Sequence, residues 1–166
     1  MTTLLSAHRV TIDSLEFARS GGHLQGAVEI TAVERLHGHL NSRAGQLEWQ
    51  LDGVADHAGK PALRLAVSGV LDLVCQRCLA GYAFDIKSNS LLLLENADDA
   101  PLGGDDAAES IPPSSALDVE ALVEDEVILA LPIAPRHPEG KCAARVADGW
   151  DQNVHPFAAL AKLKKI

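Results

Sequence analysis

Two of the three cysteines in the chain lie close together in the stretch VCQRCL, where Cys75 and Cys78 form a Cys-x-x-Cys pair. Such a pair serves either redox chemistry or metal binding. A redox pair of the thioredoxin kind has its first cysteine at a helix N-terminus, where the helix dipole lowers the pKa of the thiol. The residues around this pair instead predict two strands joined by a turn, which is the geometry of a zinc knuckle.

The third cysteine, Cys142, ends the stretch PRHPEGKC, which also carries His137. A knuckle supplies only two ligands, so a tetrahedral zinc site needs two more from elsewhere in the chain. A Cys3His set would consist of Cys75, Cys78, His137 and Cys142. The spacing alone leaves three alternatives open, which are zinc binding, thiols without a ligand and redox chemistry.

The elements that must position these residues are mostly strands. Apolar residues alternate with polar ones in GQLEWQLDGVAD and in ALRLAVSGVLDLVC, which predicts two strands joined by a turn at HAGKP. YAFDIKSNSLLLLE predicts a third strand, and an earlier one is expected near Leu24 to Ile30, after a short element around Ile12 to Ala18. Sequential strands with short connections favour an antiparallel β-meander.

Two helices are expected after these strands. ALDVEALVEDEVILALP predicts an acidic helix that Asp118 or Ser115 caps and Pro132 ends, and HPFAALAKLKKI predicts a short C-terminal helix with Pro156 in its first turn. The predicted fold class is therefore α+β, with a β-meander core, a Cys-x-x-Cys knuckle turn, one acidic helix and a short C-terminal helix. We expect a single domain over 1–166.

The acidic helix raises the question of catalysis. A projection at about 100° per residue places Glu126 on the apolar face, with Val119, Leu122, Val123, Val127, Leu129 and Ala130, and places Asp118, Glu120, Glu124 and Asp125 opposite. Clustered carboxylates can serve acid–base catalysis or bind a hard metal, but a solvated helix face is the better interpretation. No nucleophile, His–acid pair or phosphate-binding glycine loop accompanies them, so we expect no enzyme and no small-molecule substrate.

The charge of the chain is unevenly distributed. Its 166 residues carry a formal net charge of -9, yet no Lys or Arg stands between Ser88 and Pro135, where eleven acids lie. The stretch 96–113 has the composition of a flexible acidic loop. An acidic band repels phosphate backbones and favours a basic protein partner. The candidate partner-binding acids are Asp98, Asp99, Asp105, Asp106, Glu124 and Asp125.

The compartment is predicted from features that the chain lacks. No run of about 18 apolar residues occurs, and the N-terminal stretch lacks the pattern of a signal peptide. Three cysteines cannot complete a disulfide framework by themselves. We therefore expect a cytoplasmic protein that does not contact a membrane.

Three blocks of the sequence resemble a known family. VSGVLDLVCQRCL, then VEDEVILALPIAPRH followed by a cysteine, then PFAALAKLK occur in the order found in the bacterial YceD family, the large ribosomal RNA subunit accumulation proteins. The resemblance runs from about Leu24 to the end. It implies a non-enzymatic factor needed for accumulation of large-subunit ribosomal RNA, often encoded beside a small, basic large-subunit ribosomal protein. Family members from other bacteria carry further cysteines in the segment matching His137 to Cys142, which favours zinc.

Two functions remain open. The first is an interaction protein that binds a basic large-subunit ribosomal protein or an assembly intermediate. The second is a zinc-knuckle RNA-binding module that contacts ribosomal RNA through four bases beside the cysteines, which are Arg77, Arg136, Lys141 and Arg145. A buried Glu126 needs a cationic partner or several donors. Because the resemblance includes both the CQRC turn and the VEDE helix, Arg77 is the partner that we predict for Glu126.

Overall fold

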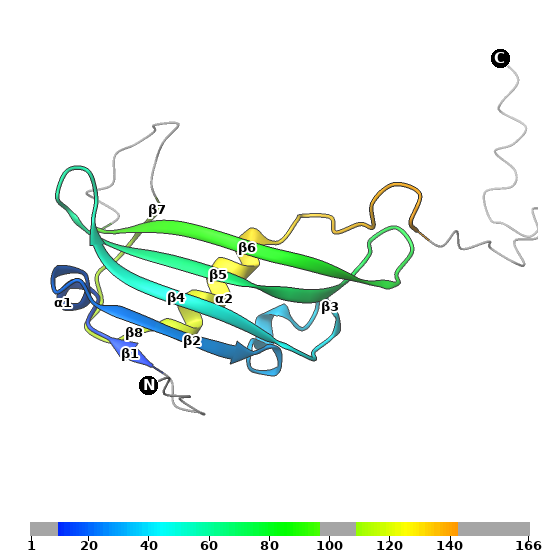
Figure 1. Cartoon of the computed structure of the whole chain (residues 1–166), viewed down its shortest axis with the longest axis horizontal. Helices are drawn as coiled ribbons and strands as arrows, with labels where there is room; N and C mark the ends of the chain where they lie inside the picture. Colours follow the sequence, from blue (N-terminus) through cyan, green and yellow to red (C-terminus); the bar gives the residue numbers. More distant parts are fainter. Residues whose placement is uncertain (1–9, 97–108, 143–166) are drawn as a thin grey trace, which may run out of the picture.

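A long, curved and mostly antiparallel sheet dominates the structure (Figure 1), a computed structural model that describes residues 10–96 and 109–142. Five strands pair in the order β2-β4-β5-β6-β7, and β3 pairs with β5. In chain order the elements are β1 (Thr11–Ile12), α1 (Ser14–Arg19), β2 (His23–Glu29), η1 (Ile30–Ala32), η2 (Glu34–Leu36), β3 (Leu40–Ser42), β4 (Gln46–Ala55), β5 (Pro61–Val74), β6 (Gly81–Leu94), β7 (Glu109–Ile111), β8 (Leu117–Asp118) and α2 (Val119–Ala130).

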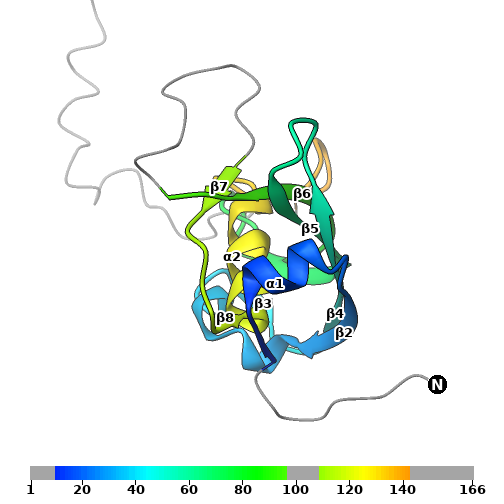
Figure 2. The same cartoon turned by 90° about the vertical axis from the view of Figure 1, so that its left-hand side faces the viewer.

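The core lies on one face of the sheet. The alternating apolar residues predicted to be buried are buried, and they are Leu47, Trp49, Leu51, Leu63, Leu65, Val67, Leu71 and Leu73. Side chains of a strand point alternately to the two faces, so these residues all lie on the face that α2 covers. Figure 2 shows α2 against this face and α1 near one end of the sheet. The predicted α+β fold and antiparallel meander are confirmed.

Some of the strand pairing was not predicted. β7 pairs in parallel with β6, and the two-residue strands β1 and β8 form a separate two-stranded sheet. Most of the predicted loop 96–113 lies outside the described residues, and within it Glu109–Ile111 forms β7. The predicted C-terminal helix in 155–166 also lies outside them. Within the described ranges, no helix is both long and apolar enough to cross a membrane.

Helix α2 begins as predicted. The side chain of Asp118 accepts hydrogen bonds from the backbone N–H groups of Glu120 and Ala121, and the helix ends at Ala130, two residues before Pro132. Its buried face contains Glu126, which is only 5% exposed, as the projection predicts. Leu129 was wrongly placed on that face, because its side chain is 66% exposed. It falls at the edge of the apolar arc, in the last turn of the helix.

Candidate metal centre

The Cys-x-x-Cys pair lies in a tight turn between β5 and β6, as predicted. The backbone N–H of Leu79 donates to the carbonyl of Cys75 at 2.8 Å, and the N–H of Cys75 donates to the carbonyl of Ala80 at 2.9 Å. Leu79 adopts a left-handed backbone conformation, with φ of 61°, that reverses the chain after the second cysteine. Both cysteines are buried at this end of the sheet.

The segment that follows α2 runs back to this turn. The backbone N–H of Gln76 donates to the carbonyl of Pro135 at 2.8 Å, which joins the turn to the segment that carries His137. The N–H of Lys141 donates to the carbonyl of Pro138 at 3.1 Å and turns the chain toward Cys142. The imidazole of His137 also packs against Tyr82, with 5.0 Å between the ring centroids.

These contacts bring all four predicted ligands together. The ligand atoms of Cys75, Cys78, His137 and Cys142 all lie within 4.8 Å of one another. Cys75 Sγ lies 3.6 Å from Cys142 Sγ, and His137 Nδ1 lies 3.4 Å from Cys78 Sγ and 3.7 Å from Cys142 Sγ. Zinc bonds of about 2.3 Å to sulfur and 2.0–2.1 Å to nitrogen give a tetrahedron with edges of about 3.5–3.8 Å. The donor set and its spacing therefore fit one tetrahedral metal ion.

The sulfur atoms also accept hydrogen bonds from Arg77. Its Nε–H donates to Cys142 Sγ at 2.9 Å, and its backbone N–H donates to Cys75 Sγ at 3.4 Å. Donors of this kind orient and support the sulfur ligands of a metal site. The contact with Cys142 in turn raises the pKa of the Arg77 guanidinium, so that it stays charged.

The ionisation of the two knuckle cysteines differs. Burial is the largest influence on Cys75 and opposes ionisation, but hydrogen bonds from backbone groups of His137, Cys78 and Arg77, and from the His137 side chain, outweigh it and lower its pKa to about 5. At Cys78 the backbone of Ala80 favours the thiolate, but burial and the other two sulfur atoms raise the pKa. Several neighbouring thiols cannot all ionise without cost, because the resulting thiolates repel one another, and a divalent cation would offset that repulsion.

The prediction that Arg77 pairs with Glu126 is wrong. Glu126 Oε1 instead accepts hydrogen bonds from the hydroxyl groups of Ser88 and Ser90 on β6, the second at 2.7 Å. Arg77 lies in the knuckle turn and contacts the sulfur atoms. Of the two kinds of partner expected for a buried Glu126, a cation or several hydrogen-bond donors, the structure has the second.

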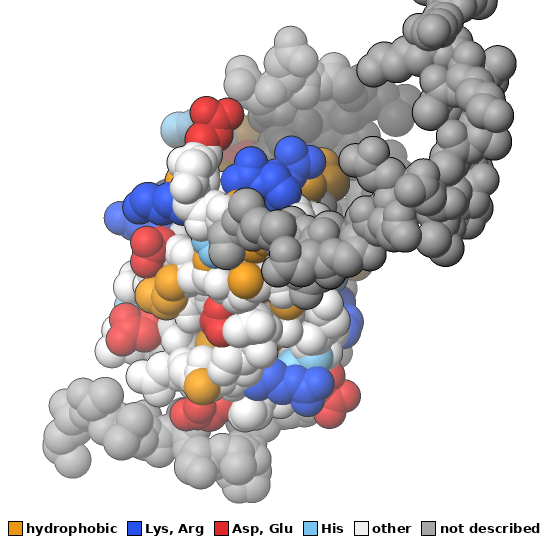
Figure 3. All heavy atoms as spheres, turned by 90° about the vertical axis from the view of Figure 1, so that its right-hand side faces the viewer, with side chains coloured by type: hydrophobic (Ala, Val, Ile, Leu, Met, Phe, Trp, Pro, Cys, Tyr) orange, Lys and Arg blue, Asp and Glu red, His pale blue; other side chains and the backbone are white. Residues whose placement is uncertain are grey.

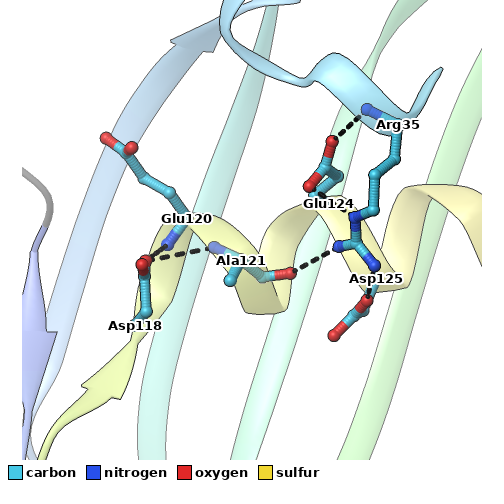
Figure 4. A network of polar contacts seen from close by, with 6 residues as sticks. All are labelled: Arg35, Asp118, Glu120, Ala121, Glu124 and Asp125. Carbon is cyan, nitrogen blue, oxygen red and sulfur yellow. Dashed lines mark hydrogen bonds and ion pairs between the residues drawn. The ribbon is translucent and has the colours of Figure 1, made fainter. Parts of the chain in front are cut away.

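The predicted partner-binding acids have different positions. Glu124 and Asp125 bind Arg35 of η2: Nε donates to Glu124 Oε2 and Nη1 donates to Asp125 Oδ1, both at 2.7 Å (Figure 4). Glu124 is thus not on a solvated face, since its side chain is only 15% exposed. The other four, Asp98, Asp99, Asp105 and Asp106, lie outside the described residues.

Comparison with known proteins agrees with the resemblance seen in the sequence. The family model of the large ribosomal RNA subunit accumulation protein YceD matches residues 63–164, which include all four residues of the Cys3His cluster, and the chain belongs to this family. A relative from Haemophilus influenzae, named large ribosomal RNA subunit accumulation protein YceD, is 26% identical over 173 residues, covering 94% of this chain and 95% of the relative. No solved structure matches the chain. Family membership connects the chain with accumulation of large-subunit ribosomal RNA.

Proposed function

We propose that the chain is a non-enzymatic factor that supports accumulation of large-subunit ribosomal RNA and ribosome assembly in the cytoplasm. It acts by binding a basic large-subunit ribosomal protein or an assembly intermediate. The Cys3His cluster holds zinc, which fixes the segment 131–142 against the end of the sheet.

The convergence of four protein ligands carries the proposal of a structural role. Structural zinc sites have four protein ligands, whereas catalytic sites have three and leave a position for water or substrate. The four ligand atoms here lie within 4.8 Å of one another, so all four positions of a tetrahedral site can be filled by protein ligands. A zinc ion in this cluster would stabilise the fold rather than activate a substrate.

The charge distribution supports a basic protein as the partner. The chain has a formal net charge of -9, and the stretch from Ser88 to Pro135 contains no Lys or Arg. An acidic surface attracts a basic partner, speeds encounter and suppresses contact with nucleic acid. A basic large-subunit ribosomal protein has the complementary charge.

One observation favours RNA as a second candidate. Arg77, Arg136 and Lys141 are exposed and flank the cysteines and His137. Figure 3 views the molecule from the end that carries the β5–β6 turn, and Lys and Arg side chains lie beside apolar ones there. The candidate base Arg145 lies outside the described residues. A zinc-knuckle module could use such a patch to contact ribosomal RNA phosphates.

The two candidates are separated by binding measurements near physiological salt. The full chain is titrated with purified basic large-subunit ribosomal proteins and, separately, with isolated large-subunit RNA. We expect it to bind one of the proteins, with slower association after Asp98, Asp99, Asp105 and Asp106 are replaced by Asn or Ser. Binding to RNA alone would favour the RNA-binding module. If the neutralised variant associates with the protein at the wild-type rate, the loop is only a linker.

A further inference from the structure

A groove with a volume of about 230 Å³ lies beside α2, away from the cysteines. Residues of η2, β6, β7 and α2 line it. Its aliphatic lining is formed by Leu92, Ile111, Leu122, Ile128 and Leu129. The exposed side chain of Leu129 stands at its rim, so the groove is open to a partner.

The charged residues of the groove are unbalanced. Three carboxylates, those of Glu109, Asp125 and Glu126, line it together with a single cation, Arg35. Arg35 is already committed, because its guanidinium binds Glu124 and Asp125 and lies 3.5 Å from the carbonyl oxygen of Ala121 (Figure 4). The groove therefore has excess negative charge.

One carboxylate oxygen of Glu126, Oε2, is available to accept a hydrogen bond from a partner. Ser88 and Ser90 both donate to Oε1, and no residue in 10–96 or 109–142 is seen to donate to Oε2. The described part of the chain has no buried side-chain oxygen without a partner, so Oε2 is reached from solvent. Because Glu126 lines the groove and is otherwise buried, the groove is its route to solvent.

We infer that this groove binds a lysine or arginine side chain from an amphipathic segment of the basic protein partner. The cationic group contacts Glu126 Oε2, and the methylene stem lies along the aliphatic lining, as long basic side chains do on apolar surfaces. A charge-assisted hydrogen bond in a partly buried site is stronger than one at the surface. The inference rests on the proposed function and names the surface that performs it.

The test compares two variants that add the same charge at different places. Leu129→Lys places a cation at the rim of the groove. Val70→Lys, the control, places one on β5, where Val70 is 51% exposed and its neighbour Leu71 is fully buried, so Val70 points away from the core. Both wild-type side chains are exposed, so neither variant should disturb folding. Any general effect of net charge is the same in the two variants.

The full chain and its variants are titrated with the purified basic large-subunit ribosomal proteins. We expect Leu129→Lys to weaken the wild-type interaction at least about tenfold, because a cation at the rim repels the basic side chain that enters the groove, and Val70→Lys to leave it nearly unchanged. Glu126→Gln, which keeps the acceptor for the serines but removes the charge, should also weaken it.

Each contrary result has a distinct meaning. If the wild-type chain binds none of these proteins, the proposed function fails. If it binds one and Leu129→Lys binds equally well, or if both lysine variants are equally weakened, the groove is not the site. Self-association of the wild-type chain that Leu129→Lys abolishes would show that a second copy occupies the groove, and would overturn the inference.

Discussion

Cys75 Sγ lies 3.6 Å from Cys142 Sγ, although 67 positions separate the two cysteines in the sequence. One belongs to the turn between two long strands, and the other belongs to the segment that follows α2. Within the described residues, one backbone hydrogen bond joins the turn to the segment after α2, and it runs from the N–H of Gln76 to the carbonyl of Pro135. The side chains of the Cys3His cluster therefore provide most of the contacts between the turn and this segment, and a metal ion bound by all four would hold the two together.

Arg77 should tune metal binding without being a ligand. Arg77→Ala removes the N–H that donates to Cys142 Sγ, and we expect zinc affinity to fall about tenfold to hundredfold, as it does when residues that support metal ligands are replaced. Affinity is measured by competition with a chromophoric chelator.

The control for Arg77 is Arg64→Ala, which removes an exposed arginine from β5. That variant should bind zinc like the wild type. If both variants keep wild-type affinity, the hydrogen bond from Arg77 has no part in metal binding.

Glu126 should stabilise the fold by accepting hydrogen bonds from the hydroxyl groups of Ser88 and Ser90. Glu126→Ala leaves both hydroxyls without an acceptor and opens a hole under α2, so the free energy of unfolding should fall by about 2–3 kcal/mol. Glu126→Gln retains an acceptor of the same shape and should cost less than about 1 kcal/mol. Urea denaturation measures both. Equal losses in the two variants would show that the charge, and not the acceptor, holds the helix.

The strands β4, β5 and β6 were predictable because one face of each is buried, and the alternation of apolar residues records this. β7 could not be predicted, because Glu109–Ile111 is too short to show an alternation of apolar and polar residues. It becomes a strand only where the chain returns to pair with β6. The burial of Glu126 followed from the helical period. Its serine partners did not, because they depend on how α2 lies over β6.

The members of the Cys3His cluster could be predicted from residue type and spacing, since cysteine is rare in this chain, two of the three cysteines stand at a knuckle spacing, and His137 precedes the third closely. The contact of Arg77 with Cys142 could not, because it depends on how the segment after α2 folds back. The position of Arg77 between two cysteines was the available signal. It was interpreted instead as a partner for a distant carboxylate.

Asp52 should make stability depend on pH in the acidic range. A hydrogen bond with His23, at 2.5 Å, and another from Gln50, at 2.8 Å, hold the pKa of Asp52 below its ordinary value. A carboxyl group whose pKa is lowered by folding stabilises the protein above its unfolded pKa of about 4, and that contribution is lost as the pH falls through the folded value.

The matching variant is Asp52→Asn, which cannot titrate. Between about pH 5 and pH 3 the wild type should lose more stability in urea denaturation than Asp52→Asn loses, since only the wild type must protonate this carboxylate on unfolding. Parallel losses in the two proteins would mean that the bond with His23 does not favour the ionised form of Asp52.

The proposed zinc centre is tested most directly by the metal content of the protein. The full chain, purified without chelators, should contain about one zinc ion per chain by elemental analysis, and X-ray absorption should show three sulfur atoms at about 2.3 Å and one nitrogen at about 2.0–2.1 Å. Cys78→Ser should lower the zinc content, and removal of the metal should destabilise the wild-type fold. A wild-type chain that contains no zinc and is fully stable would contradict a structural zinc site in the Cys3His cluster.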